Sequence, residues 1–182
     1  MKKKIKIILA LVIIVLVFGK SIARYFYPIQ YSNYIVKYAN EYNVDPYLIA
    51  AVIKAESNFD EAAISNKNAY GLMQITPETA KWAAKKMGIS DFSVDMLMTP
   101  EFNIKMGCWY INDLKNEFNG NIEVVLAAYN GGRGNVKKWL NEKEHSDDGK
   151  NLHYIPFEET SKYVKRVKVN YNIYKYLYKN KL

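Results

Sequence analysis

The sequence predicts an all-α domain, and three observations support this prediction. Apolar and aromatic residues follow helical spacing: Tyr34, Ile35, Tyr38 and Ala39, for example, share one helix face. A capping side chain followed by proline, which is a helix-start signal, occurs three times along the chain. No segment shows convincing β-type alternation, and no internal repeat is present.

The chain has 182 residues, enough for one globular domain with a core that needs neither disulfides nor metals. We expect a signal peptide or signal-anchor over residues 1–24, a linker over residues 25–32 and the helical domain over residues 33–182. The first segment opens with lysines and continues with an uninterrupted apolar run over residues 7–18. This run matches a signal-peptide core and is shorter than the roughly 20 residues that span a bilayer comfortably.

Two fates of the N-terminal segment stay open. Cleavage after Ala23 would release the domain, but Lys20 and the bulky Tyr25, Phe26 and Tyr27 make this a poor cleavage site. We therefore favour an uncleaved membrane anchor. No cysteine follows the apolar run, which argues against a lipid-modified anchor. In both cases the positive-inside rule predicts that the remaining chain is exported across the membrane.

The net charge of +8 is concentrated at the two ends of the chain. Residues 1–24 carry six basic and no acidic side chains, and residues 162–182 carry seven and none, so the middle is net acidic. A nucleic-acid-binding domain should instead be basic on its folded body, and we expect no nucleic-acid partner. Basic ends suit contact with anionic lipid or an anionic matrix. A simply solvated helix face explains the C-terminal lysines equally well.

The single cysteine and the two histidines give no sign of reactive or metal chemistry. Cys108 is flanked by apolar residues and is expected to pack in the core, and no His lies in a motif that would activate its thiol. His145 and His153 lie in a polar loop without regularly spaced ligands, so we expect no metal site.

Capping and stop signals place each helix. Thr76 and Thr99 precede prolines, as Asp45 does, and Gly88 and Asn119 are typical helix ends. The expected helices begin at Asn33, run from Pro46 to Glu56, from Thr76 to Gly88 and from Thr99 to Phe118, and then cover residues 122–129, 136–140 and 157–178. We expect a long ordered loop over residues 58–70 and a mobile surface loop over residues 141–151.

Four short blocks stand at helix ends, where side chains can converge on a cleft: Glu56-Ser57, Gly71–Gln74, Ala128–Gly132 and Ile155–Thr160. Each has a plain structural interpretation when taken alone. Glu56 could mark the solvated end of its helix, and the glycines could be turn or stop residues.

Together, and in this order, the four blocks resemble the soluble-type lytic transglycosylases (the SLT domain), which are related to goose-type lysozymes. The resemblance covers roughly Tyr38 to Val167 and includes Ala-Glu-Ser-Asn-Phe-Asp (55–60), Ala-Ala-Tyr-Asn-Gly-Gly (127–132) and Ile-Pro-Phe-Glu-Glu-Thr-Ser-Lys-Tyr-Val (155–164). It implies a lysozyme-like helical fold and cleavage of the β-1,4 bond between N-acetylmuramic acid and N-acetylglucosamine in peptidoglycan. The implied product carries a 1,6-anhydromuramoyl end, and no cofactor is implied.

The resemblance assigns the roles residue by residue. Glu56 is the expected acid and base, and its pKa must be raised by partial burial. The residues expected to bind the glycan strand are Ser65, Met73, Gln74, Tyr129, Asn130 and Glu159. Glu158 is the exposed neighbour with which Glu159 could be confused. Asn68 and Thr76 depart from the family pattern, which puts the loop conformation and one apolar substrate contact in question.

Two alternatives to a lytic transglycosylase stay open. A lysozyme-type hydrolase on the same fold would use water where the transglycosylase uses the C6 hydroxyl of muramic acid. A catalytically idle wall-binding module is the other, but such a module would not need Glu56, Gln74, Tyr129 and Asn130 together. The sequence leaves the oligomeric state unknown.

Overall fold

The computed structural model describes residue 4, residues 18–179 and residues 181–182. Within them the chain is helical, with two isolated β-bridges (Ile64 to Tyr70 and Tyr70 to Ile75), and the all-α prediction is confirmed. The elements are a helix over residues 18–26, α2 (Ser32–Glu41), α3 (Pro46–Glu56), α4 (Pro77–Met87), the short 3₁₀ helix η1 (Val94–Met98), α5 (Pro100–Glu117), α6 (Ile122–Gly131), α7 (Arg133–Leu140) and α8 (Glu158–Tyr178).

The N-terminal segment is described only in part. Of the apolar run over residues 7–18, only Phe18 falls within the described residues. In the described part of the chain, no helix combines the length and the apolar character needed to cross a bilayer. The expected linker over residues 25–32 differs from the structure, because the helix over residues 18–26 extends into it and α2 already begins at Ser32.

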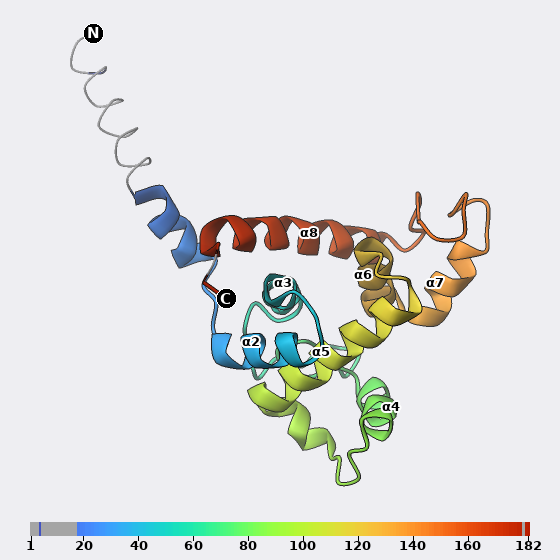
Figure 1. Cartoon of the computed structure of the whole chain (residues 1–182), viewed down its shortest axis with the longest axis horizontal. Coiled ribbons are helices and arrows are strands. Elements are labelled where there is room, and N and C mark those ends of the chain that lie inside the picture. The colour runs from blue at the N-terminus through green and yellow to red at the C-terminus, as the bar shows by residue number, and fades with distance from the viewer. Residues whose placement is uncertain (1–3, 5–17, 180) are drawn as a thin grey trace.

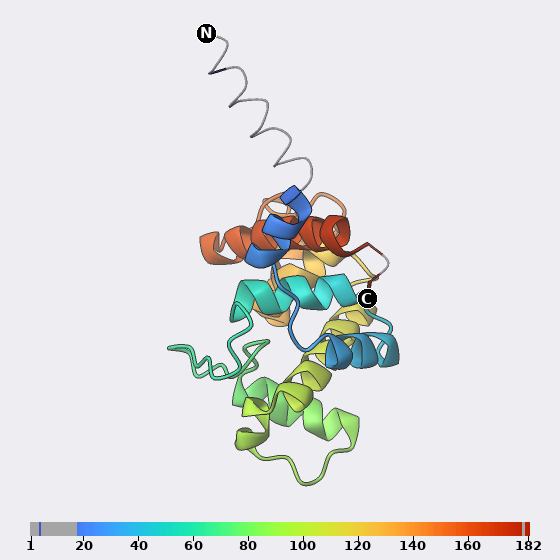
Figure 2. The same cartoon turned by 90° about the vertical axis from the view of Figure 1, so that its left-hand side faces the viewer.

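Helix α3 lies at the centre of the domain, with α8 on one side and α2 and α5 on the other (Figures 1 and 2). Its start is the predicted one: the Asp45 carboxylate accepts a hydrogen bond from the Tyr47 N–H (2.8 Å), and Pro46 occupies the first turn. Its residues from Leu48 to Ile53 are all buried, because α3 is covered from both sides. A helix that is apolar all round is stable only in such a position.

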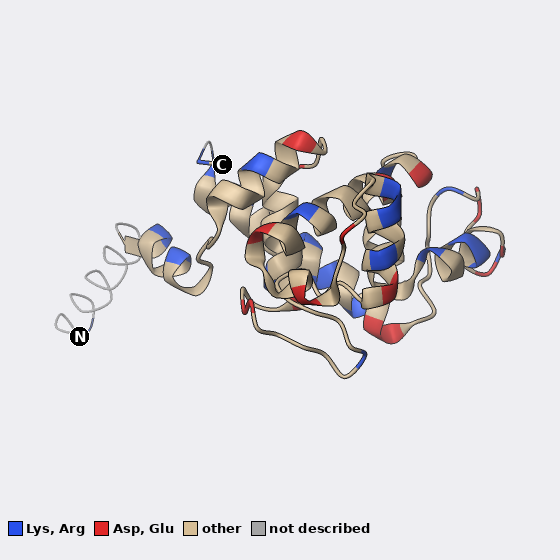
Figure 3. Ribbon diagram, turned by 90° about the horizontal axis from the view of Figure 1, so that it is seen from below, with Lys and Arg blue, Asp and Glu red and all other residues tan. Residues whose placement is uncertain are grey.

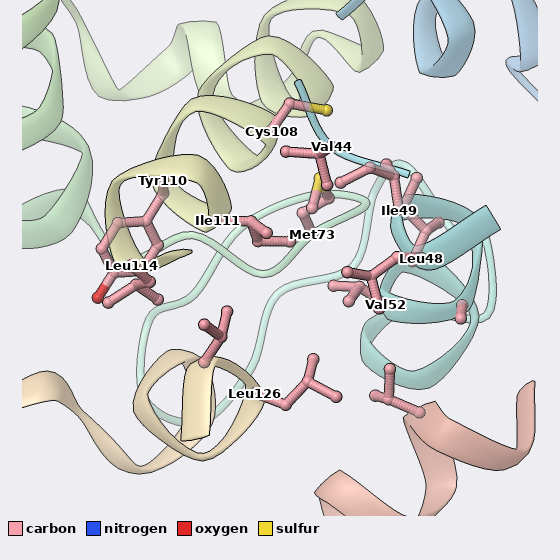
Figure 4. Packing of buried hydrophobic residues seen from close by; sticks show 14 of the residues in the cluster. Val44, Leu48, Ile49, Val52, Met73, Cys108, Tyr110, Ile111, Leu114 and Leu126 are labelled. Atoms are coloured by element: carbon pink, nitrogen blue, oxygen red, sulfur yellow. The ribbon is translucent and has the colours of Figure 1, made fainter. Parts of the chain in front are cut away.

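The core joins α3 to α5, α6 and the loop after α3. Figure 4 shows Ile49 and Val52 of α3 facing the side chains of Ile111 on α5 and Met73 of the loop. Cys108 is fully buried in the same cluster, as expected, and burial raises the pKa of its thiol.

One helix start differs clearly from the predicted one, and one short helix was not predicted. Helix α7 begins at Arg133 and not at residue 136, because Gly132 (φ 88°, ψ 135°) ends α6 and starts α7 without an intervening loop. The 3₁₀ helix η1 had no clear signal in the sequence. Asn121 caps α6 by accepting from the N–H groups of Glu123 and Val124.

The long loop between α3 and α4 is ordered, as predicted, and Asn103 of α5 holds it in place. The buried Asn103 side chain accepts from the Met73 N–H (2.8 Å) and donates to the carbonyls of Tyr70 (2.8 Å) and Leu97 (2.9 Å). Two of these bonds satisfy backbone groups of the loop, and the third satisfies a carbonyl of η1. The loop therefore lies at a fixed height above α5, next to the end of α3.

We expect Gly71→Ala to destabilise the domain much more than Gly88→Ala. Both glycines have left-handed backbones (φ +71° and +72°), so both substitutions carry the same cost of about 1 kcal/mol for that conformation. A Cβ on Gly71 would lie 2.5 Å from the Leu97 carbonyl oxygen and 2.6 Å from Asn103 Nδ2, whereas Gly88 has no such neighbour within 4 Å. Urea unfolding should show an additional loss of about 1–3 kcal/mol at Gly71. Equal losses at the two sites would contradict this account of the loop.

Candidate active site

Glu56 is the last residue of α3, and the loop supports this helix end from the side. The Ser57 hydroxyl donates to the Leu72 carbonyl (2.8 Å), and the Ser57 N–H continues the helical bonding to Ile53. The carboxyl group is thus fixed at the junction of a buried helix with an anchored loop. Such a junction gives a side chain on rigid support access to a cleft.

The environment of Glu56 raises its pKa to about 7. Burial is the main cause, because it disfavours the charged form, and the negative charge of Glu159 adds to the effect. Tyr163 and Arg166 act in the opposite direction and lower this pKa. Near neutral pH the carboxyl group is therefore present in comparable amounts as acid and as carboxylate, which suits a group that first donates and then accepts a proton.

Two tyrosines lie near Glu56: Tyr129 is partly buried and Tyr163 is fully buried. The Tyr129 hydroxyl on α6 donates to the Met73 carbonyl (2.7 Å), which ties α6 to the loop. The Tyr163 hydroxyl on α8 is buried without a hydrogen-bond partner among the described residues, although it lies close enough to Glu56 to influence its ionisation. Burial and the charge of Glu56 raise the pKa of both phenols well above its usual value, so both are neutral donors.

Tyr163 is a site residue to which the sequence assigned no role. It lies within the segment 155–164, where the resemblance drew attention to Glu159. The spacing of apolar residues along α8 could have identified it. Tyr163 lies one turn after Glu159 and shares the buried face of the helix with Val164 and Val167. A buried phenol without a partner is unusual in a core and calls for a functional explanation.

The expected loop residues Ser65 and Gln74 bind backbone groups of the loop itself. The Ser65 hydroxyl accepts from the N–H groups of Lys67 (3.2 Å) and Ala69 (3.0 Å), which leaves its hydrogen free to be donated. Gln74 has a left-handed backbone (φ 48°), and its amide nitrogen donates to the carbonyls of Ala63 (3.0 Å) and Gly71 (2.8 Å). Both side chains therefore stabilise the conformation of the loop.

The remaining expected residues occupy different depths. The Met73 side chain is fully buried, with its sulfur where a Cβ on Gly107 would lie, so it reaches the site only through its backbone carbonyl. Asn130 is partly exposed, and its amide oxygen accepts from the Thr160 hydroxyl (2.8 Å), which leaves the amide N–H groups available to a ligand.

A pocket of about 250 Å³ opens beside Asn130 and is lined by Lys67, Asn130, Gly131, Phe157, Glu158, Glu159 and Thr160. Lys67 of the loop and Glu159 in the first turn of α8, which both line this pocket, form an ion pair (3.2 Å). Both side chains are more than two-thirds exposed, so the pair adds little to stability. Glu158 pairs instead with Lys162 on its own helix (2.6 Å), which distinguishes the two neighbouring acids.

The geometry gives one proton-transfer group and a polar pocket. Amide, hydroxyl, carboxylate and ammonium groups surround one aromatic ring, that of Phe157, which suits a ligand with many hydroxyl and amide groups. No group of three or more metal-ligating side chains is found in the part of the chain that the structure describes.

Comparison with known proteins identifies a family. Residues 33–152 match the Transglycosylase SLT domain family. The chain is 34% identical to the soluble lytic murein transglycosylase of Salmonella typhimurium over 143 residues, which are 78% of this chain and 22% of that protein. It is 36% identical to the membrane-bound lytic murein transglycosylase C of Yersinia pestis over 130 residues, which are 66% of this chain and 35% of that protein.

The structural comparison agrees. The 70 kDa soluble lytic transglycosylase of Escherichia coli superposes with a TM-score of 0.78 at 30% identity, covering 87% of this chain and 26% of the other. The lytic transglycosylase Slt of Pseudomonas aeruginosa, solved as an inactive mutant, gives 0.73 at 34% identity, covering 82% and 24%. The chain thus spans about a quarter of the length of the soluble enzymes it matches.

We expect Glu56→Gln to stabilise the domain at high pH. The folded pKa of about 7 lies above the usual value of 4.5, so the native state holds a proton that the unfolded chain releases, and stability falls as the pH rises from 4.5 to 7. A shift of this size corresponds to at most about 3 kcal/mol. Glutamine cannot ionise, and its advantage over glutamate in urea unfolding should grow by about 2 kcal/mol between pH 5 and pH 8.

The exposed Glu78 on α4 provides the matched control. Glu78→Gln should differ from wild type by the same small amount at both pH values. A Glu56→Gln effect that did not change with pH would mean that Glu56 is not held in a charge-disfavouring site.

Proposed function

Because the chain belongs to the Transglycosylase SLT domain family, we propose that it is a lytic transglycosylase acting on peptidoglycan. The bond cleaved is the β-1,4 link between N-acetylmuramic acid and N-acetylglucosamine, and the product carries a 1,6-anhydromuramoyl end. The observation that carries this proposal is Glu56, one partly buried carboxyl group whose pKa of about 7 suits it for both steps of the reaction.

The reaction needs one carboxyl group because the substrate provides its own nucleophile. In the first step the Glu56 acid donates its proton to the glycosidic oxygen, and the bond from that oxygen to C1 of the muramic acid breaks. In the second step the Glu56 carboxylate removes the proton from the C6 hydroxyl of the same sugar, and the C6 oxygen bonds to C1. Glu56 ends the cycle protonated, and no water is consumed.

The other site residues would bind and orient the glycan. We assign Ser65, Gln74 and Asn130 to hydrogen bonds with hydroxyl and acetamido groups, because each keeps polar capacity beyond its internal bonds. Glu159 would bind substrate through its exposed carboxylate once the Lys67 pair opens. Met73 would act through its carbonyl, which positions the Tyr129 hydroxyl beside Glu56.

The neutral Tyr163 phenol would donate to Glu56 as its charge appears. This hydroxyl lies against the carboxyl group and meets no other acceptor in the described part of the chain. A donor that strengthens its bond to the carboxylate stabilises Glu56 after proton transfer and keeps its pKa from rising further.

The lysozyme-type alternative differs in one step. In a hydrolase, a water molecule would attack C1 in place of the C6 hydroxyl. Ordinary glycosidases need a second carboxyl group, either to activate that water or to form a covalent intermediate. Glu159, the carboxylate that influences Glu56, is exposed and paired with Lys67, which favours substrate binding over nucleophilic attack. An idle wall-binding module would have no use for a carboxyl group whose burial costs stability.

We also propose that the domain works outside the cytoplasmic membrane of a bacterium, tethered by its N-terminal segment. The basic start, the apolar run over residues 7–18 and the poor cleavage site support an anchor, and cleavage would give a secreted enzyme instead. A relative named as membrane-bound shows that the family includes such a location.

We expect Glu56→Gln to abolish the release of anhydromuropeptides from purified sacculi. Loss of the proton donor and acceptor should lower the rate by at least about 10²–10⁴. Glu159→Gln should weaken activity less, through substrate binding, and Glu158→Gln should stay close to wild type because Glu158 pairs with Lys162. Mass spectrometry of the products decides the reaction type, since a hydrolase product is heavier by one water. Full activity of Glu56→Gln would refute the assignment.

The pH profile should show the ionisation of Glu56. Because the acid form starts the reaction, kcat/KM should be constant below about pH 7 and fall above it. Tyr163→Phe removes a group that lowers this pKa, so the falling limb should move to higher pH. If folded Tyr163→Phe shows the fall in kcat/KM at the same pH as wild type, Tyr163 does not influence the ionisation of Glu56.

A further inference from the structure

One end of the molecule exposes a cluster of aromatic and aliphatic side chains. Of the ten large hydrophobic residues that are exposed among the described residues, six belong to the helix over residues 18–26 or to α8: Phe18, Ile22, Tyr25, Phe26, Val169 and Tyr176. We call the surface formed by residues 18–27 and residues 169–178 the terminal surface. Tyr25 (81% exposed), Phe26 (63%) and Tyr176 (66%) are too exposed to be core residues.

The terminal surface contains an apolar groove of about 620 Å³. Ala23, Phe26 and Tyr27 form one wall, and four residues of α8 form the other: Asn172, Ile173, Tyr176 and Leu177. Exposed apolar patches of this kind mark interaction sites, because leaving them in water is unfavourable. The pocket lined by Asn130 and Glu159, which we call the glycan pocket, lies elsewhere, beside the first turn of α8.

The two parts of the terminal surface are firmly joined. The Arg24 guanidinium donates twice to the Leu177 carbonyl (3.1 and 2.6 Å), one of the carbonyls that a helix end leaves unpaired. The Tyr178 hydroxyl donates to the Tyr27 carbonyl (2.9 Å), and the rings of Tyr27 and Tyr174 meet edge to face at 5.8 Å. The helix over residues 18–26 is therefore fixed against α8 and is no free linker.

The charges around the terminal surface are positive. Neither residues 18–40 nor residues 160–182 contain an acidic side chain, and the described N-terminal helix carries only basic side chains among its charged ones (Figure 3). Lys20 lies 4.9 Å over the Tyr176 ring and Lys175 lies 5.0 Å over that of Tyr171, so exposed ammonium groups border the aromatic patch. Asp45, which accepts from the Tyr171 hydroxyl (2.6 Å), is an acidic neighbour at the side of this patch.

We propose that the terminal surface docks on an anionic lipid bilayer. Aromatic side chains favour the headgroup region, and each nearby Lys or Arg is attracted to anionic lipid. Charge complementarity favours lipid over a second copy of this chain, because two copies would bring like charges together. The order of the residues in the sequence is consistent with this, since Phe18 of the terminal surface is the last residue of the apolar run over residues 7–18.

Docking would fix the distance of the glycan pocket from the bilayer and the direction in which the pocket opens. Helix α8 begins at the pocket with Glu159 and reaches the terminal surface at Tyr176, a distance of about 25 Å along the helix axis. The helix would then hold the pocket away from the lipid as a rigid spacer. The docking proposal rests on the proposed membrane location, but vesicle binding needs no catalysis, so its test is independent of the proposed catalytic activity.

A fluorescent probe at Asn172 tests the docking. Asn172 is exposed and lines the groove, and the buried native Cys108 should not compete for a thiol-reactive dye. The full chain with Asn172→Cys would carry an environment-sensitive dye, with Ser90→Cys as control in the loop after α4, at the opposite end of the molecule in Figures 1 and 2. On vesicles of phosphatidylcholine and phosphatidylglycerol, the dye at position 172 should move into an apolar environment and the dye at position 90 should stay in water.

Charge variants test the role of the basic residues. Lys20→Gln with Lys175→Gln should lower the ratio of docked to undocked protein on these vesicles by on the order of tenfold. Lys81→Gln with Lys85→Gln removes the same charge from the exposed face of α4 and should leave the ratio unchanged. A water-exposed dye at position 172 on vesicle-bound protein would overturn the proposal. Equal effects of the two pairs of charge substitutions would also overturn it. A dye response that depends on protein concentration without lipid would overturn it too, because it would indicate self-association.

Discussion

The placement of the Glu56 carboxyl group among buried side chains is the constraint on which the rest of the site depends. Residues Leu48 to Ile53 of α3 are buried because α8 lies on one side of this helix and α2 and α5 lie on the other, and the helix ends with its one acidic side chain. Tyr129 of α6 and Tyr163 of α8 lie near this end; burial of the carboxyl group raises the pKa of Glu56, and the Tyr163 hydroxyl partly offsets this rise. A better-solvated carboxyl group would favour stability and would lose the proton that the reaction requires.

The loop after α3 contains several left-handed backbone conformations, which are unfavourable for residues with side chains. Asn58, Phe59, Asn68 and Gln74 all have positive φ values, as Gly71 does. The Asn103 amide and the Ser57 hydroxyl compensate by satisfying loop carbonyls and N–H groups in the interior. Asn68, at φ 54°, takes up the left-handed conformation that asparagine tolerates, so its departure from the family pattern leaves the loop intact.

The sequence carried enough local information for most of the fold. Asp45, Thr76 and Asn121 lie where caps are needed, and their side chains make the capping bonds. The helix over residues 18–26 was harder to recognise, because its partner, the Leu177 carbonyl, is 153 positions away from Arg24. For the site, the resemblance pointed to Glu56 and its neighbours, but a sequence does not show how deeply each side chain is buried. Whether Met73 faces a ligand or the core, and whether Tyr163 meets an acceptor, depends on how α5 and α8 pack.

Helix α8 connects the two surfaces of the protein, and its rotation about its axis must be fixed for either to form. Successive residues of a helix differ by about 100° in direction, so a shift of one position would turn Tyr163 away from Glu56. Distant contacts prevent such a shift: Asn170 reaches the Ala51 carbonyl (3.5 Å) and Tyr174 reaches the Pro28 carbonyl (3.3 Å). The tyrosines near the end of α8 that fix the N-terminal helix therefore also fix the rotation of Tyr163. The contacts near the terminal surface and the position of Tyr163 beside Glu56 thus depend on the same rotation of one helix.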